Sequence, residues 1–192
     1  TRTRISFELA EKRLSADITN FSADVSSVNK GEGLKDTIQN IHAMKMDCVV
    51  MRHPVSGSCF HVSQFVDAVV INAGDGTHEH PTQALLDMMS LWEKFDKLKG
   101  LNIAIVGDIL HSRVALSNIY GLQKMGANVT LCGPPHLIPK GIGELGVSIN
   151  SDIDEVIEWA DALNILRIQK ERMGVGIIPS IREYRDFFGI TQ

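Results

Sequence analysis

Short apolar runs alternate with segments of helical periodicity along this chain. Apolar runs occur at residues 47–51, 69–72, 101–106, 129–132 and 162–166. Short apolar runs of this kind are typical of strands buried in a parallel sheet. Strands that alternate with helices form βαβ units, so the pattern predicts an α/β fold with parallel sheets.

Helical segments surround these runs, and two further strands are also predicted. The predicted helices span 34–46, 58–66, 81–95, 112–125, 153–159 and 180–188, with a further helix at the start of the chain. The two further strands are a short strand at 17–21 and a weak strand at 147–149. Because the long helix at 81–95 divides two strand–helix series, we expect two parallel-sheet α/β domains joined by it, at residues 1–81 and 82–192.

The opening segment, Thr1-Arg2-Thr3-Arg4, places two hydroxyls and two guanidinium groups at the start of a predicted helix. A helix N-terminus has unpaired N–H groups and the positive end of the helix dipole, which favour an anion. Arginine adds a planar fork that matches phosphate oxygens. These residues predict a phosphate site, although an ordinary helix start with exposed arginines remains open.

Polar and cationic side chains gather where predicted strands end. In parallel α/β sheets, ligands bind beyond the carboxyl ends of the strands. Four strand ends carry such side chains, at residues 52–54, 72–80, 107–113 and 167–169. They supply Arg52, His80, Arg113 and Arg167, and Gln83 follows in the next helix. Several cationic strand ends together predict one site for a polyanionic ligand.

Each candidate has a structural alternative that the sequence leaves open. Arg52 could be a surface strand end, and His80 could be a helix-cap partner. Arg167 could pair with Glu155 or Glu158. In the polar loop at 22–33, Ser26 and Lys30 could simply be solvated.

The sequence offers no nucleophile and no complete metal or cofactor motif. It lacks a Gly-x-Ser-x-Gly segment, and His78 with His80 falls short of the three or four ligands that a metal site needs. The Gly107-Asp108 segment lacks the further glycines of a dinucleotide fingerprint. We therefore expect no metal and no cofactor, and catalysis by positioning and electrostatic stabilisation.

Composition and charge indicate which partners and which cellular compartment to expect. The net charge of −4 argues against a general nucleic-acid binder, and no apolar run has the length of a membrane span. Three widely spaced cysteines fit a reducing cytoplasm. The chain begins without an initiator Met and in a predicted helix, so we expect a fragment that is incomplete at both ends.

Five motifs in order give the chain a family resemblance. They are Thr1-Arg2-Thr3-Arg4-Ile5-Ser6-Phe7-Glu8, Met51-Arg52-His53-Pro54, Asn72-Ala73-Gly74-Asp75-Gly76, His80-Pro81-Thr82-Gln83 and Arg167-Ile168-Gln169-Lys170-Glu171-Arg172. Over essentially its whole length, the chain resembles the catalytic chain of aspartate transcarbamoylase. The resemblance implies a transcarbamoylase-like fold, with a carbamoyl-phosphate domain followed by an aspartate domain. It also implies carbamoyl transfer from carbamoyl phosphate to L-aspartate in pyrimidine biosynthesis.

The resemblance also assigns roles to individual residues. Thr1, Arg2 and Thr3 match a phosphate-binding turn. Arg52 matches the arginine between phosphate and carbonyl oxygen. His80 matches the donor to the carbamoyl oxygen, and Gln83 matches the amide that holds the carbamoyl nitrogen. Thr3, Arg52, His80 and Gln83 are thus the predicted catalytic residues.

Further matches concern the second substrate and the assembly. Arg113, Arg167 and Gln169 match binders of the aspartate carboxylates. Ser26 and Lys30 match a mobile loop that reaches a neighbouring active site, because the family's catalytic unit is a homotrimer with shared sites. The family's serine before Thr1 and its His-Pro-x-Pro loop have no match here. A regulatory chain or another pyrimidine-pathway enzyme stays open as a partner.

Two other functions compete with this interpretation. Ornithine transcarbamoylase has the same phosphate turn, but ornithine carries a side-chain cation where aspartate carries a second carboxylate. Arg113, Arg167 and Gln169 therefore favour aspartate, as does Thr82. The other alternative is a non-catalytic relative that binds phosphate metabolites, against which the intact set of predicted site residues argues.

Overall fold

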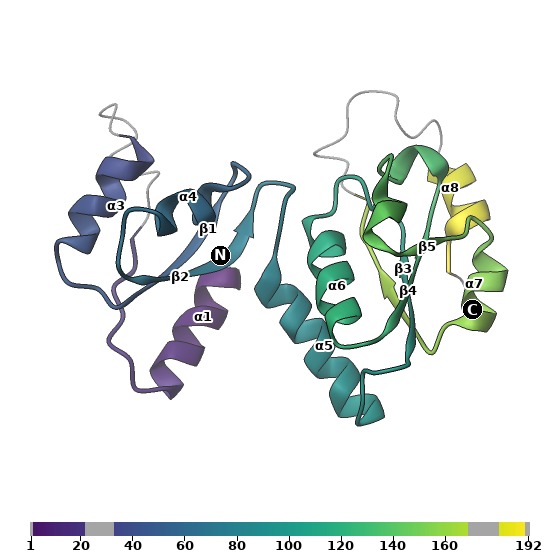
Figure 1. Cartoon of the computed structure of the whole chain (residues 1–192), viewed down its shortest axis with the longest axis horizontal. Coiled ribbons are helices and arrows are strands. Elements are labelled where there is room, and N and C mark those ends of the chain that lie inside the picture. Colours follow the sequence, from purple (N-terminus) through teal and green to yellow (C-terminus); the bar gives the residue numbers. More distant parts are fainter. Residues whose placement is uncertain (1, 22–32, 169–180, 191–192) are drawn as a thin grey trace. The chain divides into compact units, whose positions relative to one another are not determined.

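The computed structural model describes residues 2–21, 33–168 and 181–190. The chain forms two compact units, Thr1–Asp75 and Gly76–Gln192, each with its own parallel sheet (Figure 1). The prediction of two parallel-sheet α/β units is thereby confirmed. None of the helices in the described parts of the chain is long and apolar enough to cross a lipid bilayer.

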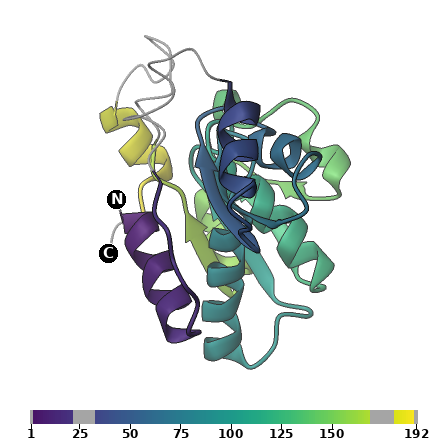
Figure 2. The same cartoon turned by 90° about the vertical axis from the view of Figure 1, so that its left-hand side faces the viewer.

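The first unit is built on a pair of parallel strands. β1 (Cys48–His53) pairs with β2 (Val69–Asp75), with Cys48 opposite Val69. Helices α3 (Leu34–His42) and α4 (Ser58–Ser63) lie against this pair (Figures 1 and 2). Their contact surface is a small core in which Ile38, Met51 and Val62 are buried. This core fixes the strand that carries Arg52.

The start of the chain agrees with the predictions only in part. Helix α1 (Arg2–Arg13) is present, but none of its residues is buried, and its apolar Ile5 and Leu9 are exposed. The prediction of a strand at 17–21 is wrong, because this segment is irregular. A strand needs a partner for its backbone hydrogen bonds, and β1 and β2 pair only with each other in the described chain.

The second unit has a four-stranded parallel sheet with helices on both faces (Figure 1). The strand order is β5 (Ser148–Ile149), β4 (Asn128–Cys132), β3 (Asn102–Val106) and β6 (Ala162–Ile165). The helices of one face are α5 (Pro81–Phe95) and α6 (Arg113–Lys124). Those of the other face are α7 (Ile153–Trp159) and α8 (Ile181–Phe188).

Strand β3 shows why its sequence is apolar without alternation. Ile103 and Ile105 are buried in the core beneath α5 and α6, whereas Ala104 and Val106 are buried in the core beneath α7. Successive side chains of a strand point to opposite faces, so a strand covered on both faces is apolar at every position.

The carboxyl ends of β3, β4 and β6 meet at one edge of this sheet. The backbone N–H of Gly107 donates to the Cys132 carbonyl at 2.8 Å, and the Leu166 N–H donates to the Val106 carbonyl at 2.7 Å. Gly107 adopts φ +123°, and a Cβ there would lie 2.8 Å from the Leu166 carbonyl oxygen. Only glycine fits this close crossing, which brings the polar segments after the strands together.

Candidate functional site

The first unit joins the opening turn of α1 to the carboxyl end of β1. Arg52 Nη1 donates a 2.7 Å hydrogen bond to Thr3 Oγ1, across 49 residues of sequence. Arg52, Arg2 and Arg4 are exposed, whereas Thr3 is half-buried. A hydroxyl and a guanidinium at the first turn of a helix form a local environment that favours a phosphate oxygen.

Asp75 fixes the turn that leaves β2. Its side chain is 1% exposed, and its carboxylate accepts hydrogen bonds from the Gly57 N–H at 2.7 Å and from Asn72 Nδ2 at 3.0 Å. Asn72 Oδ1 in turn accepts from the Gly74 N–H at 2.7 Å. A buried carboxylate with fixed donors holds this turn in one conformation.

His80 and Gln83 lie on the first turn of α5, in the second unit. His80 occupies the N-cap position, but its side chain makes no capping hydrogen bond. Its backbone N–H donates to Ser117 Oγ at 2.9 Å, and the Ser117 hydroxyl donates to Glu79 Oε2 at 2.9 Å. Helix α6 therefore holds the backbone at His80, and the imidazole does not serve as the helix cap.

Asp87 is a residue of this region that the sequence analysis missed. Gln83 Nε2 donates to Asp87 Oδ1 at 2.9 Å, one turn farther along α5. The spacing of Gln83 and Asp87 indicates this contact, because residues four apart on a helix are neighbours. A carboxylate at this spacing from a candidate substrate-binding amide could have been recognised from the sequence.

Arg113 lies in the first turn of α6 and is largely buried. It is 9% exposed, and its Nη1 donates to the Gly76 carbonyl at 3.4 Å. Ser112 caps the helix by accepting from the Ala115 N–H at 3.4 Å. The guanidinium is thus directed by α6 toward the segment that follows β2.

Asp108 lies in the turn after β3, within the strand end 107–113 that the sequence predicts to be polar. Its side chain is fully buried, and its Oδ1 lies 2.8 Å from His111 Nδ1 and accepts from the His111 N–H at 3.2 Å. Burial, together with the negative charge of Asp108, raises the pKa of the nearby Tyr184 phenol. The carboxylate is held by its own turn, while the tyrosine stays protonated.

Of the remaining predicted site residues, only Arg167 lies among the described residues. Arg167 follows β6 at the edge where the ends of β3 and β6 meet, and it is exposed. Thr1, Ser26, Lys30 and Gln169 lie outside the described residues. The hydrogen bonds of the described chain bring together Thr3 with Arg52, and the first turn of α5 with α6.

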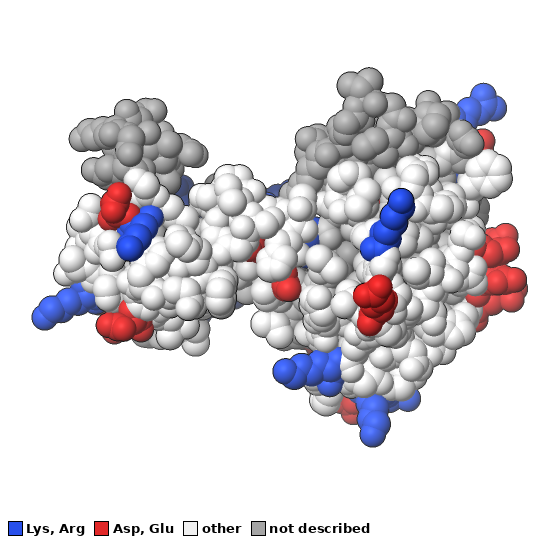
Figure 3. Space-filling model, turned by 45° about the horizontal axis from the view of Figure 1, so that its top comes forward, with Lys and Arg blue, Asp and Glu red and all other residues white. Residues whose placement is uncertain are grey.

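Charge is dispersed over the described surface. On the face shown in Figure 3, lysine and arginine side chains are interspersed with aspartate and glutamate. The residues described on this face therefore form no broad basic area.

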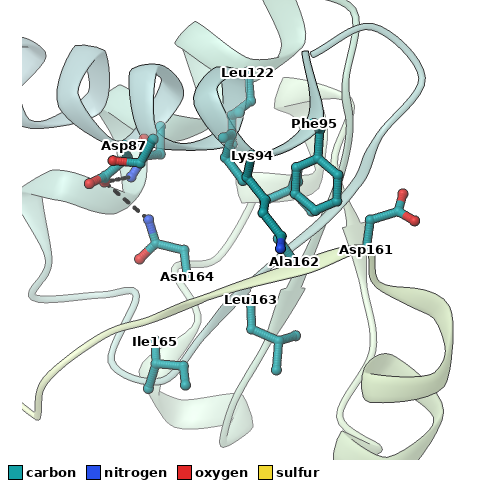
Figure 4. A pocket seen from close by; sticks show the side chains of 13 residues that line it. Asp87, Lys94, Phe95, Leu122, Asp161, Ala162, Leu163, Asn164 and Ile165 are labelled. Atoms are coloured by element: carbon teal, nitrogen blue, oxygen red, sulfur yellow. Dashed lines mark hydrogen bonds between the residues drawn. The ribbon is translucent and has the colours of Figure 1, made fainter. Parts of the chain in front are cut away.

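A pocket of about 530 Å³ opens between α5, α6 and β6 in the second unit (Figure 4). Phe95 and Leu122 contribute apolar surface to it. Asp87, Asn118 and Asn164 contribute its polar end, where Figure 4 shows the hydrogen bonds of the Asp87 carboxylate. This polar end adjoins Gln83 through Asp87.

The chain is similar to known proteins in both sequence and structure. Residues 1–93 match the family described as aspartate/ornithine carbamoyltransferase, carbamoyl-P binding domain. The chain is 59% identical over 191 residues to the aspartate carbamoyltransferase catalytic subunit of Gemmatimonas aurantiaca, covering all of this chain and 60% of that protein. It is 57% identical over 192 residues to the same subunit of Cytophaga hutchinsonii, covering all of this chain and 62% of the relative.

The chain is also similar to solved structures of aspartate transcarbamoylase. Aspartate transcarbamoylase from Trypanosoma cruzi, in complex with aspartate and phosphate, matches with a TM-score of 0.79 and 34% identity over 91% of this chain and 60% of that one. Its complex with carbamoyl phosphate matches with a TM-score of 0.78 over 90% of this chain and 57% of that one. The chain thus spans about three fifths of the length of its relatives. The sequence similarity to aspartate carbamoyltransferase catalytic subunits extends over all 192 residues of this chain.

Proposed function

We propose that the whole protein transfers the carbamoyl group of carbamoyl phosphate to the amine of L-aspartate. The products are N-carbamoyl-L-aspartate and phosphate, in de novo pyrimidine biosynthesis. The observation that carries the proposal is the contact of Arg52 with Thr3, because both residues are assigned to carbamoyl phosphate by the family pattern. The relatives' names and the carbamoyl phosphate and aspartate complexes of the Trypanosoma cruzi enzyme support it.

The reaction needs no covalent enzyme intermediate, because carbamoyl phosphate is already activated. The neutral aspartate amine attacks the carbonyl carbon, and the carbonyl oxygen gains negative charge. The C–O bond to phosphate then breaks, and the amine loses a proton, which we assign to the departing phosphate. This chemistry also explains why the proposal includes no metal and no cofactor.

Three donors serve the developing oxyanion in this proposal. They are the Thr3 hydroxyl, the Arg52 guanidinium and the His80 imidazole, each worth about 2.7–4 kcal/mol by analogy with oxyanion holes. Gln83 accepts from the carbamoyl nitrogen. His80 acts as a hydrogen-bond donor, not as a general base.

The other predicted residues bind charge on the two substrates. Thr1 and Arg2 hold the phosphate together with Thr3. The aspartate carboxylates are assigned to Arg113, Arg167 and Gln169. The burial of Arg113 supports this role, since a guanidinium fixed by its surroundings is preorganised for a carboxylate.

The proposal assigns carbamoyl phosphate to a domain at residues 1–81 and aspartate to a domain at 82–192. The match of residues 1–93 to a carbamoyl-phosphate-binding domain supports the first assignment. We further propose a homotrimer in the cytoplasm, in which Ser26 and Lys30 reach a neighbouring active site. Three cysteines with free thiols support a reducing compartment.

The test is a carbamoylation assay on the whole protein with each amino acid offered separately. We expect turnover with aspartate and none with ornithine; turnover with ornithine alone would overturn the assignment of the second substrate. Calorimetry with a phosphonate–dicarboxylate bisubstrate analogue tests catalysis against mere metabolite binding. A transferase binds this analogue far more tightly than phosphate or a dicarboxylate alone.

A further inference from the structure

The Asp87 carboxylate is the centre of a hydrogen-bond network that includes Gln83. Its Oδ1 accepts from Gln83 Nε2 at 2.9 Å. Its Oδ2 accepts from Asn118 Nδ2 of α6 at 2.8 Å and from Asn164 Nδ2 of β6 at 3.2 Å (Figure 4). The network therefore joins α5, α6 and β6 through one side chain.

An ionised carboxylate only accepts hydrogen bonds, so every amide that faces it must present its NH₂ group. This fixes the orientation of all three amides, since the two ends of an amide are distinguished by their hydrogen-bond partners. With its NH₂ group committed to Asp87, Gln83 retains its carbonyl oxygen Oε1 for another partner.

The surroundings of Asp87 hold the carboxylate in place. Asn118 is fully buried, and its own Oδ1 has no hydrogen-bond partner among the described residues. Leaving a buried acceptor unpaired is unfavourable, so the orientation of Asn118 follows from the carboxylate and not from a better contact elsewhere. Because Asn118 and Asn164 both donate to Oδ2 of Asp87, the other oxygen, Oδ1, faces Gln83.

The nitrogen of a carbamoyl group carries two N–H donors and needs an oxygen opposite it. We propose that Asp87 is a positioning residue that fixes the Gln83 amide with Oε1 toward the carbamoyl nitrogen. Asp87 would thereby make the site prefer a carbamoyl phosphate to an acyl phosphate that lacks N–H groups. This inference rests on the proposed function, in which Gln83 holds the carbamoyl nitrogen.

The test variant is Asp87→Asn, which keeps the size of the side chain and adds a donor. Asn118 and Asn164 hold the oxygen of the new amide, so its NH₂ group faces Gln83. Gln83 must then turn its oxygen inward and present its own NH₂ group to the substrate.

The measured quantities are the KM for carbamoyl phosphate and the inhibition constant of acetyl phosphate, at saturating aspartate. Acetyl phosphate has a methyl group in place of the amine. We expect the KM for carbamoyl phosphate to rise about 10- to 100-fold in Asp87→Asn, as for a buried donor left unpaired. The inhibition constant of acetyl phosphate should change less than about twofold, since the contact is absent from that ligand.

Two further variants separate positioning from general damage. Gln83→Ala should lose the same preference, and the double variant should lose little more, because both changes remove one interaction. Gln123→Ala is the matched control: it removes a 2.8 Å hydrogen bond from Gln123 Nε2 to the Leu145 carbonyl elsewhere in the same unit. It should lower stability and leave the carbamoyl-to-acetyl ratio unchanged.

An unchanged ratio in Asp87→Asn would overturn the inference, even with reduced stability. If that variant does not fold, Asp87→Ser removes the carboxylate without adding an amide, and a ratio equal to that of the wild type would again overturn it. Absence of carbamoyl transfer to aspartate by the wild-type protein would instead refute the proposed function.

Discussion

Arg52 Nη1 donates a hydrogen bond of 2.7 Å to Thr3 Oγ1 and so connects the opening turn of α1 with the end of β1. The two residues are 49 positions apart in the chain. None of the residues of α1 is buried, so this contact does not follow from burial of an apolar helix face. Among the described residues, α1 therefore meets β1 through this polar pair and not through a buried apolar face.

The first prediction concerns Thr3. Thr3→Val keeps the shape and removes the hydroxyl, so Arg52 loses its partner and the oxyanion loses a donor. We expect kcat/KM for carbamoyl phosphate to fall about 10- to 100-fold, as for a charge-assisted hydrogen bond. Thr3→Ser keeps the hydroxyl and should retain most activity. Steady-state kinetics measure both, and equal kinetics for Thr3→Val and the wild type would exclude the role.

The second prediction concerns His80. If the imidazole donates a hydrogen bond to the carbamoyl oxygen, His80→Ala lowers kcat by about 100- to 1000-fold across the whole pH range. His80→Gln, which restores a donor, should recover part of the rate. The measurement is the pH dependence of kcat. Loss of only the acidic or the basic limb of the profile would instead identify His80 as a proton-transfer group.

The third prediction concerns the crossing at Gly107. Gly107→Ala places a Cβ 2.8 Å from the Leu166 carbonyl oxygen at a backbone φ of +123°. We expect it to lower the free energy of unfolding by about 2–4 kcal/mol, from backbone strain and overpacking together. Gly100→Ala, at φ +80° with nothing within 4 Å, is the control and should cost about 1–2 kcal/mol. Equal urea midpoints for the two variants would contradict the steric argument.

The fourth prediction concerns the reactivity of the thiols. Burial raises the pKa of Cys59 and of Cys132 to about 11; partial burial also raises the pKa of Cys48, but this residue is exposed and the other two are buried. Since the thiolate is the reactive form, iodoacetamide at pH 8 should modify Cys48 first. The other two cysteines should react only after unfolding. Mass spectrometry of timed samples measures this order, and early modification of Cys132 would show that the sheet of the second unit opens readily.

The fifth prediction follows from the two buried thiols, Cys59 and Cys132. In the unfolded chain they ionise near the ordinary thiol pKa of 9.0, whereas in the folded protein burial raises the pKa to about 11 and keeps them protonated. The folded state then binds more protons, so their contribution to stability is lost as the pH rises from 9 to 11. Unfolding by urea at several alkaline pH values should show this fall. Cys132→Ala should have a shallower slope, and an unchanged slope would contradict the assignment.

The residues of the candidate site could be predicted, but only some of their contacts could be. The helix at 81–95 and the helix at 153–159 occur at the predicted residues, because their periodicity is strong. The prediction of a strand at 17–21 was wrong, since a strand depends on a partner that local sequence does not reveal. The four-residue spacing of Gln83 and Asp87 indicates their contact, but the hydrogen bonds of Asp87 with amides on α6 and β6 could not be predicted from local sequence.

Local sequence patterns are sufficient to predict the α/β class, most of the succession of strands and helices, and the polar residues at the strand ends. These depend on periodicity and on local turn chemistry, which neighbouring residues decide. Three features arise only in the folded chain: the strand order β5-β4-β3-β6, the contact of Thr3 with Arg52, and the network in which Asp87 accepts from Gln83. The first two join segments far apart in the chain, and the third depends on Asn118 and Asn164 holding Asp87 from other elements. Their energies depend on distances that exist only once the chain has folded.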